Sequence, residues 1–159
     1  MPGRCLPTML RKARIADVKT IHSLIESYAK KGEMLPCALV DLYERIRDFY
    51  VFSDDKTGEI LGACALHICW EDLGEIRSLA VKSEEINKGI GKIMATACLE
   101  EAAMLGIEKV FALTYRPEFF SKLGFQIIDK SVLPHKIWGD CIKCSKFPEC
   151  DETAMMMQL

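Results

Sequence analysis

The sequence predicts a single α/β domain with a mixed, mostly antiparallel central sheet flanked by helices. Three observations lead to this prediction. Half of the 159 residues are apolar, which is enough for one core of ordinary size. Apolar residues keep helical spacing in some segments and form strand-like runs in others. These two kinds of segment alternate without a linker, a low-complexity tract or an internal repeat.

Charge and composition exclude several classes of protein. The formal net charge is −2, with 21 basic and 23 acidic residues, so nucleic-acid and membrane partners are not expected. No apolar run approaches the roughly 20 residues of a membrane span. The opening residues 1–10 lack the apolar core of a signal peptide. We therefore expect a cytoplasmic protein.

The first third of the chain predicts one strand and two helices. Residues 9–15 alternate weakly, as a strand does. Asp17 is placed to cap the next helix, which has apolar residues at helical spacing and ends at Gly32. A second helix follows Pro36, and four apolar residues share one of its faces: Leu39, Leu42, Tyr43 and Ile46.

The middle of the chain predicts three strands and a helix. Residues 49–54 and 60–70 are strand-like and flank a hairpin turn at residues 54–59, so these two strands should pair antiparallel. Residues 73–82 form the next strand. A loop with two glycines follows this strand, and residues 90–105 form the helix after the loop.

The last third predicts two strands, a short helix and a terminal strand. Residues 109–115 form a strand. A short helix follows, with Pro117 at its start and Gly124 at its end. Residues 125–129 form another strand, and a further one is expected near residues 152–159. The strand and helix order favours one α/β domain over several.

The glycine loop, residues 86–92, is a candidate phosphate site. Gly89 and Gly91 lie at the start of the predicted helix, where backbone N–H groups lack helical partners and point outward. The positive end of the helix dipole, Lys88 and Lys92 favour an anion there. The spacing matches neither a Walker loop nor a three-glycine dinucleotide fingerprint. A ligand-free helix cap is therefore an equal alternative from the local sequence.

Three segments in order resemble a known family. Residues 73–102, then "VFALTY" at residues 110–115 and "EFFSKLGF" at residues 118–125, resemble the GNAT superfamily of acetyl-CoA-dependent N-acetyltransferases. The resemblance runs from about residue 9 to residue 128 and implies a GNAT-like fold. It also implies that the glycine loop grips the cofactor pyrophosphate and that the preceding strand pairs with the pantetheine arm. With this resemblance, the phosphate cradle becomes the favoured interpretation.

The resemblance implies a set of cofactor-binding residues. The loop donors are Asn87, Lys88, Gly89, Ile90, Gly91 and Lys92. The strand contacts are Leu79, Ala80 and Val81. Phe120, also assigned to the cofactor, stands where many members carry a tyrosine general acid. Ile86 stands where the family loop usually begins with Gln or Arg, which predicts a modest loss of affinity because most of the grip comes from the backbone.

The strand before the loop also offers candidate catalytic groups. Glu75 and Arg77 are two residues apart and therefore share a face of that strand. Glu75 is the candidate base that takes the proton of the amine, directly or through a water. Arg77 is the candidate clamp for a substrate carboxylate. In the alternative interpretation, the two residues only neutralise each other. Tyr115 is the candidate acid for the departing thiolate, with a packing role or protonation by water as alternatives.

A narrower resemblance covers nearly the full length. It is carried by "ESYAKKGEMLP", "LYERIRDFYVF", "GACALHICWEDLGEIRSLAV" and "HKIWGDCIKCSKFPECDE". These segments resemble short, stand-alone amino-acid N-acetyltransferases of the N-acetylglutamate synthase type. The implied reaction is the acetylation of L-glutamate, at the entry to arginine synthesis. Two carboxylates call for two cations, so Arg77 and Arg116 are the candidates, with Lys122 third. Cys37 stands where this group often has an arginine, which weakens the prediction of glutamate.

Two other classes of function stay open. One is a GNAT enzyme that acetylates another small amine or a protein N-terminus, although Arg77 and Arg116 would repel a cationic acceptor. The other is a non-catalytic acetyl-CoA sensor or interaction module, which Phe120 in place of tyrosine keeps open. The expected partners are acetyl-CoA and a small amino acid, and a homodimer is an open alternative to a monomer. We expect an N-terminal extension at residues 1–8 and the acetyltransferase domain at residues 9–159.

Eight cysteines fall into two groups. Five are scattered and are expected to be reduced core residues: Cys5, Cys37, Cys64, Cys69 and Cys98. Three crowd into a cysteine-rich segment at residues 135–151: Cys141, Cys144 and Cys150. Their spacing suits one zinc ion, but a fourth ligand such as His135 would be needed. A disulfide and a packed tail of reduced thiols are the alternatives, and no metal site is predicted.

Overall fold

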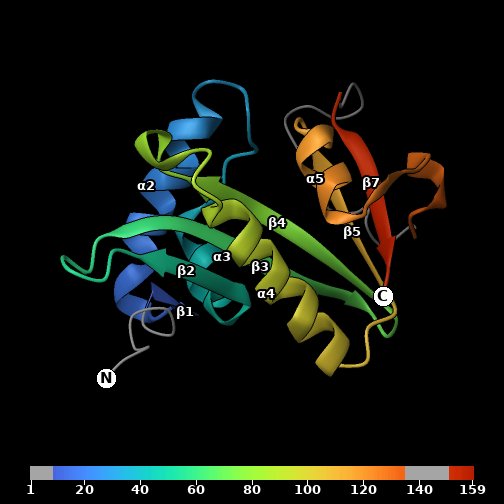
Figure 1. Cartoon of the computed structure of the whole chain (residues 1–159), viewed down its shortest axis with the longest axis horizontal. Coiled ribbons are helices and arrows are strands. Elements are labelled where there is room, and N and C mark those ends of the chain that lie inside the picture. The colour runs from blue at the N-terminus through green and yellow to red at the C-terminus, as the bar shows by residue number, and fades with distance from the viewer. Residues whose placement is uncertain (1–8, 135–150) are drawn as a thin grey trace.

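One mixed sheet organises the residues that the structure describes, 9–134 and 151–159. The structure is a computed structural model, shown in Figure 1. Its strands are β1 (Leu10–Lys12), β2 (Phe49–Ser53), β3 (Ile60–Trp70), β4 (Leu73–Val81), β5 (Lys109–Thr114), β6 (Gln126–Ile127) and β7 (Thr153–Gln158). They lie in the order β1-β2-β3-β4-β5-β7-β6. All neighbours are antiparallel except β4 and β5, which confirms the predicted mixed sheet.

Helices cover both faces of this sheet (Figure 1). The α-helices are α2 (Val18–Ala29), α3 (Leu39–Glu44), α4 (Ile90–Met104) and α5 (Pro117–Leu123). Short 3-10 turns are η1 (Ile15–Asp17), η2 (Ile46–Asp48), η3 (Ser83–Glu85) and η4 (Lys130–Val132). Helices α2 and α3 pack on one face, and α4 packs on the other. Among the described residues, no helix combines the length and the apolar character that crossing a membrane requires.

Alternation along β2 and β3 divides the buried side chains between two core clusters. Val51 of β2 packs in the cluster of α2 and α3, whereas Phe52 packs in the cluster of α4. Ala63 and Cys64 of β3 divide in the same way. Successive side chains of a strand point to opposite faces, so the apolar run of β3 fills both clusters.

Strands β4 and β5 diverge and open the sheet near its centre (Figure 1). They pair in parallel through three rows, which join Leu73 to Lys109, Gly74 to Val110 and Glu75 to Phe111. After this point β4 continues along β3, and β5 continues along β7. Among the described residues, the edge of β4 that faces β5 therefore has no strand partner beyond Glu75. We call this opening the β4–β5 split.

Most predicted elements are confirmed, and three differ clearly in extent. The strand predicted at residues 125–129 is limited to β6. The strand predicted at residues 9–15 is limited to β1, because the 3-10 turn η1 begins soon after it. The helix predicted after Pro36 divides into α3 and η2, and Leu42 is the one residue of its predicted face that is buried. A helix of six residues presents little more than one turn to the sheet, so it buries a single large side chain.

Asp17 does not cap α2 as predicted, because its side chain makes no hydrogen bond to the first N–H groups of that helix. Its carboxylate accepts from the backbone N–H of Arg14 at 2.7 Å and from the guanidinium of Arg11 at 2.7 and 3.1 Å. The cap prediction was wrong because η1 precedes α2 and offers its own unpaired N–H at Arg14. Burial raises the pKa of Asp17, but Arg11 and the Arg14 N–H outweigh burial and hold it below its usual value.

We expect Asp17→Asn to lower the free energy of unfolding at pH 7 by about 1–3 kcal/mol, because it removes charge-assisted hydrogen bonds. The folded-state pKa lies below the unfolded value, so the stabilisation is present above the unfolded pKa. It should fade as the pH falls through the folded pKa. Urea unfolding at pH 7 and in acid measures both effects. Asp72→Asn removes an exposed 3.5 Å ion pair with Lys109 and should cost less than about 0.5 kcal/mol. Equal losses of unfolding free energy in the two variants would show that the contacts of Asp17 stabilise the fold no more than an exposed ion pair does.

Candidate active site

Backbone geometry at the glycine loop presents N–H groups at the start of α4. Gly89 is the N-cap of α4 with φ +85°, and Asn87 has φ +70°. Glycine adopts this left-handed conformation at little cost. The N–H of Ile93 bonds to the Gly89 carbonyl at 3.1 Å, so the N–H groups of residues 90–92 lie ahead of this bond and have no helical acceptor. The predicted donors are therefore grouped at one helix end.

Gly91 lies close to both β4 and α5. A Cβ at this position would be 3.3 Å from the ring of Phe119 and 3.8 Å from Val81. The ring of Phe119 packs edge-on against Phe120, with centroids 5.1 Å apart. Phe120, which was predicted to contact the cofactor, is a core residue with 5% exposure. Phe119 is the aromatic side chain beside the loop, and sequence reasoning missed it.

Most charged side chains around the loop are paired with one another, and Lys92 supplies the remaining positive charge. Lys88 lies 2.8 Å from Glu85, and Lys82 lies 2.5 Å from Glu59. Lys92 is exposed, and within the described part of the chain it has no ion-pair partner. The positive end of the α4 dipole adds to this field. An anionic group of the size of a pyrophosphate fits these donors and charges.

The strand residues predicted to face the cofactor follow the β4–β5 split. Leu79 and Val81 are half-buried, and Ala80 is buried. The hydroxyl of Tyr28 donates to the carbonyl of Val81, which anchors the end of β4 to α2. Burial raises the pKa of Tyr28, so this hydroxyl remains a donor at neutral pH. An unpaired strand edge next to the loop suits an extended ligand arm with amide groups.

Glu75 lies at the apex of the split, in the last row that joins β4 to β5. It is 6% exposed, and its Oε1 accepts a hydrogen bond from Nε of Arg77 at 2.5 Å. The ion pair that the alternative interpretation requires is therefore present. A carboxylate has two oxygens and about four acceptor sites, so one carboxylate can hold Arg77 and also accept a proton from a ligand.

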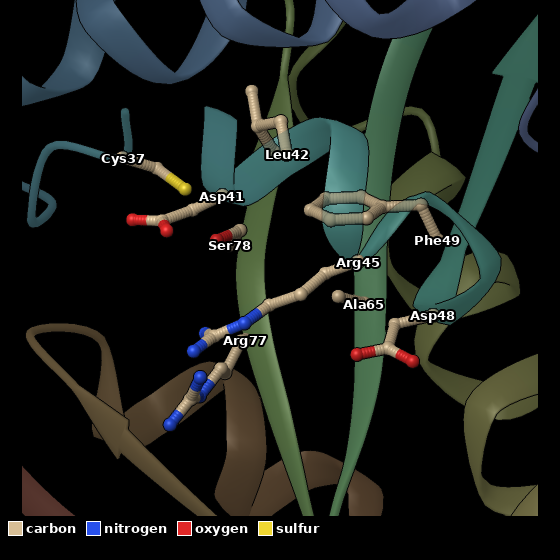
Figure 2. Close-up of a pocket in the computed structure, with 9 residues that line it drawn as sticks. All are labelled: Cys37, Asp41, Leu42, Arg45, Asp48, Phe49, Ala65, Arg77 and Ser78. Atoms are coloured by element: carbon tan, nitrogen blue, oxygen red, sulfur yellow. The ribbon is translucent and has the colours of Figure 1, made fainter. Parts of the chain in front are cut away.

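A pocket lies beside Arg77 on the α3 side of the sheet, as Figure 2 shows. Its floor is one row across three strands, because Phe49 pairs with Ala65 and Ala65 pairs with Arg77. Ala65 is small, so the space above this row is open. The rest of the lining consists of Cys37, Asp41, Leu42, Arg45, Asp48 and Ser78. We call this space the Arg77 pocket.

The other predicted acceptor residues lie elsewhere. Arg116, the N-cap of α5, is exposed and lies 3.5 Å from Glu33. Lys122 is exposed on α5. Neither of them lines the Arg77 pocket. Tyr115, the candidate acid, follows β5 and donates its hydroxyl to Asp151 at 2.8 Å.

Arg45 is the pocket cation that sequence reasoning missed. It is the C-cap of α3 and lines the pocket together with Arg77. In the sequence it resembles any charged residue on the solvated side of a short helix. No local signal identifies it, because the pocket forms only when α3 packs over β4.

Three of the scattered cysteines are buried core residues, as predicted: Cys64, Cys69 and Cys98. Cys37 is half-buried in the Arg77 pocket. The tail cysteines Cys141, Cys144 and Cys150 lie outside the described residues. The same is true of the predicted extension at residues 1–8, which contains Cys5. Residues 9–134 and 151–159 hold no group of three or more His, Cys, Asp or Glu side chains that could bind a metal ion.

Comparison of the sequence with known proteins identifies related enzymes. The profile described as "Acetyltransferase (GNAT) family" matches residues 18–125. An uncharacterized N-acetyltransferase of Chlorobaculum tepidum is 41% identical over 152 residues, which cover 96% of this chain and 97% of that protein. A Mycobacterium tuberculosis protein named amino-acid acetyltransferase is 37% identical over 140 residues, which cover 87% of this chain and 79% of that protein.

Solved structures share the fold. The crystal structure of Rv2747 from Mycobacterium tuberculosis, in complex with CoA and NLQ, matches with a TM-score of 0.82 and 31% identity, over 94% of this chain and 98% of that chain. N-acetylglutamate synthase from Neisseria gonorrhoeae, complexed with coenzyme A and N-acetyl-glutamate, matches with a TM-score of 0.85 and 26% identity. The second match covers 94% of this chain but 34% of that longer chain.

Proposed function

The chain belongs to the acetyltransferase (GNAT) family, and we propose that it transfers the acetyl group of acetyl-CoA to the α-amino group of L-glutamate. The Arg77 pocket, with two arginines in its lining, is the observation that carries the choice of an acidic acceptor. One relative is named amino-acid acetyltransferase, and one structural neighbour is an N-acetylglutamate synthase, which supports the choice. On this proposal the product enters arginine synthesis in the cytoplasm. A homodimer remains a prediction.

The cofactor is placed by backbone groups in this proposal. Acetyl-CoA, when bound, supplies an acetyl thioester that is activated for transfer to an amine. The glycine loop holds the pyrophosphate through the N–H groups of residues 87–92, at the positive end of α4. Residues 79–81 pair through the open edge of β4 with the extended arm. Gly91 keeps the loop close to Phe119 and Val81, so any larger residue would change this grip.

The acceptor must lose a proton before it can react. An α-amino group has a pKa near ~8, so at neutral pH it is mostly an ammonium ion. Glu75, at the apex of the split, accepts this proton directly or through a water. Arg77 lies on the same face of β4 and orients an acceptor carboxylate. Tyr115 is the candidate donor to the departing thiolate, with water as the alternative because a thiol of pKa ~8.5 is a tolerable leaving group.

The charge of the pocket weighs against one rival function. A polyamine or an aminoglycoside would bring several positive charges toward Arg45 and Arg77. Like charges at close range destabilise a complex. A protein N-terminus with an acidic first residue is compatible with the same pocket and therefore belongs in the test.

We expect an assay with radiolabelled acetyl-CoA, run across the twenty amino acids, to give the highest kcat/KM with glutamate. Aspartate should be poorer because it is one methylene shorter, and glutamine poorer because it lacks the second charge. Spermidine and an N-terminal glutamyl peptide complete the panel. Acetylation of glutamate no faster than of alanine or lysine would contradict the acceptor assignment. No acetylation of any amine would contradict the enzymatic proposal as a whole.

A further inference from the structure

Two guanidinium groups reach the Arg77 pocket from different elements. Arg77 comes from β4, and Arg45 comes from the end of α3. Figure 2 shows both side chains extending to the same side of the pocket. The thiol of Cys37 responds to both: burial and Asp41 raise its pKa, while Arg45 and Arg77 act to lower it. Both cations are therefore close enough to act on one point of the pocket.

The pocket does not neutralise Arg45 internally. The pKa of the Cys37 thiol is raised on balance, so it is uncharged at neutral pH. Asp48 bonds to Nδ1 of His67 at 3.1 Å. Asp41 is the other carboxylate of the lining, and neither it nor any other carboxylate among residues 9–134 and 151–159 forms an ion pair with Arg45. A partly exposed guanidinium in a partly enclosed space favours an anionic ligand group.

We propose that Arg45 selects an acceptor with an acidic side chain, by binding the side-chain carboxylate together with Arg77. This inference rests on the proposed function and deepens it. The α-amino group must reach Glu75 at the apex of the split, and the α-carboxylate shares a carbon with that amine. The side-chain carboxylate is the group that extends further from the apex, over the row of Ala65 and Arg77 toward α3.

Arg45 also accounts for two observations made on the sequence. The second cation that glutamate requires was assigned to Arg116, which pairs with Glu33 outside the pocket. Cys37 stands where the narrower resemblance leads us to expect an arginine, and Cys37 and Arg45 line the same pocket. On this proposal, Arg45 supplies to the Arg77 pocket the positive charge that was expected at residue 37.

The test compares Arg45→Ala with Arg47→Ala. Arg47 lies two residues away in η2, is exposed and does not line the pocket, so it is a matched control. We expect Arg45→Ala to raise the KM for glutamate by about 10-fold or more, with kcat and the KM for acetyl-CoA changed by less than about threefold. Its kcat/KM for alanine should stay within about twofold of wild type, so the preference for glutamate over alanine falls. Arg47→Ala should match wild type.

Two further measurements separate binding from folding. Thermal unfolding of both variants should stay close to wild type, because Arg45 is partly exposed. Calorimetry with glutamate and CoA present should show weaker glutamate binding for Arg45→Ala, and Arg45→Lys should restore part of it because the charge is kept. Equal glutamate kinetics in Arg45→Ala and Arg47→Ala would overturn the proposal. Equal losses for glutamate and alanine would also overturn it, because they would indicate a role with the α-carboxylate. A wild type that acetylates no amino acid would instead contradict the proposed function.

Discussion

Gly89→Glu should weaken acetyl-CoA binding by about 100-fold or more, because it places a negative charge where the phosphates bind. On the proposed function the loop binds the phosphates through backbone N–H groups at the start of α4, and Gly89 is the N-cap beside these donors. The backbone adds a second cost: Gly89 has φ +85°, and other residues in this conformation lose about 1–2 kcal/mol. The experiment must therefore separate charge from strain.

The chain offers a matched control at the opposite end of the same helix. Gly106 has φ +87°, and nothing lies within 4 Å of a Cβ built there, which is also true of Gly89. Gly106→Glu should therefore lose similar stability and keep cofactor affinity. Isothermal calorimetry with acetyl-CoA and thermal unfolding measure the two effects. If Gly89→Glu binds acetyl-CoA as tightly as Gly106→Glu does, the phosphate cradle is in the wrong place.

Glu75→Gln should lower kcat at pH 7 by about 100-fold, because the amine loses its proton acceptor. The deficit should shrink as the pH rises past the pKa of the amine, near ~8, since more acceptor is then already deprotonated. The KM for acetyl-CoA should change little. Rates measured across this pH range with glutamate as acceptor check the prediction.

The alternative role of Glu75 makes a different prediction. If Glu75 only neutralises Arg77, Glu75→Gln should alter the KM for glutamate and the stability but leave kcat nearly constant at every pH. Glu59→Gln is the control, because it removes an exposed ion pair of the same 2.5 Å length, with Lys82. A kcat for Glu75→Gln within twofold of that control across the pH range would rule out the proton-acceptor role.

Local signals were enough to predict the elements that frame the split. The apolar run of β3, the strand β4 and the helix α4 with its two glycines depend on periodicity and on turn chemistry within the segment itself. Long segments with one strong period are determined locally, so their predicted bounds are close to those observed. The backbone donors of the glycine loop follow from the same kind of information. Their assignment to a phosphate does not, because a ligand-free helix cap was an equal alternative until the resemblance to the GNAT superfamily was considered.

Features that depend on how the elements pack were not predictable from periodicity and turn chemistry. Asp17 accepts hydrogen bonds from Arg11 and from the N–H of Arg14 and does not cap α2. The spacing of residues in the sequence does not identify Arg11, on β1, as its partner. Arg45 enters the pocket because α3 packs over the row of Ala65, which is set by tertiary contacts. Arg116 was assigned to the acceptor by its charge and by its place after the strand opposite Arg77, whereas in the structure its side chain lies beside Glu33. A long cationic side chain reaches several partners, and the packing decides among them.

The position of β7 has a consequence for the order of folding. Strands β2, β3 and β4 follow one another in the chain and pair as neighbours. In contrast, β1 pairs with β2 and β7 pairs with β5 through residues far apart in the chain, such as Leu10 with Phe52 and Lys109 with Gln158. Distant pairs form late, because the entropy of closing a long loop is lost before the contacts form. We therefore expect β2, β3 and β4 to form first, and the β5, β7 and β6 group to join β4 later. The split between these groups is then the last part of the molecule to be completed, so acquisition of ligand affinity would mark the end of folding.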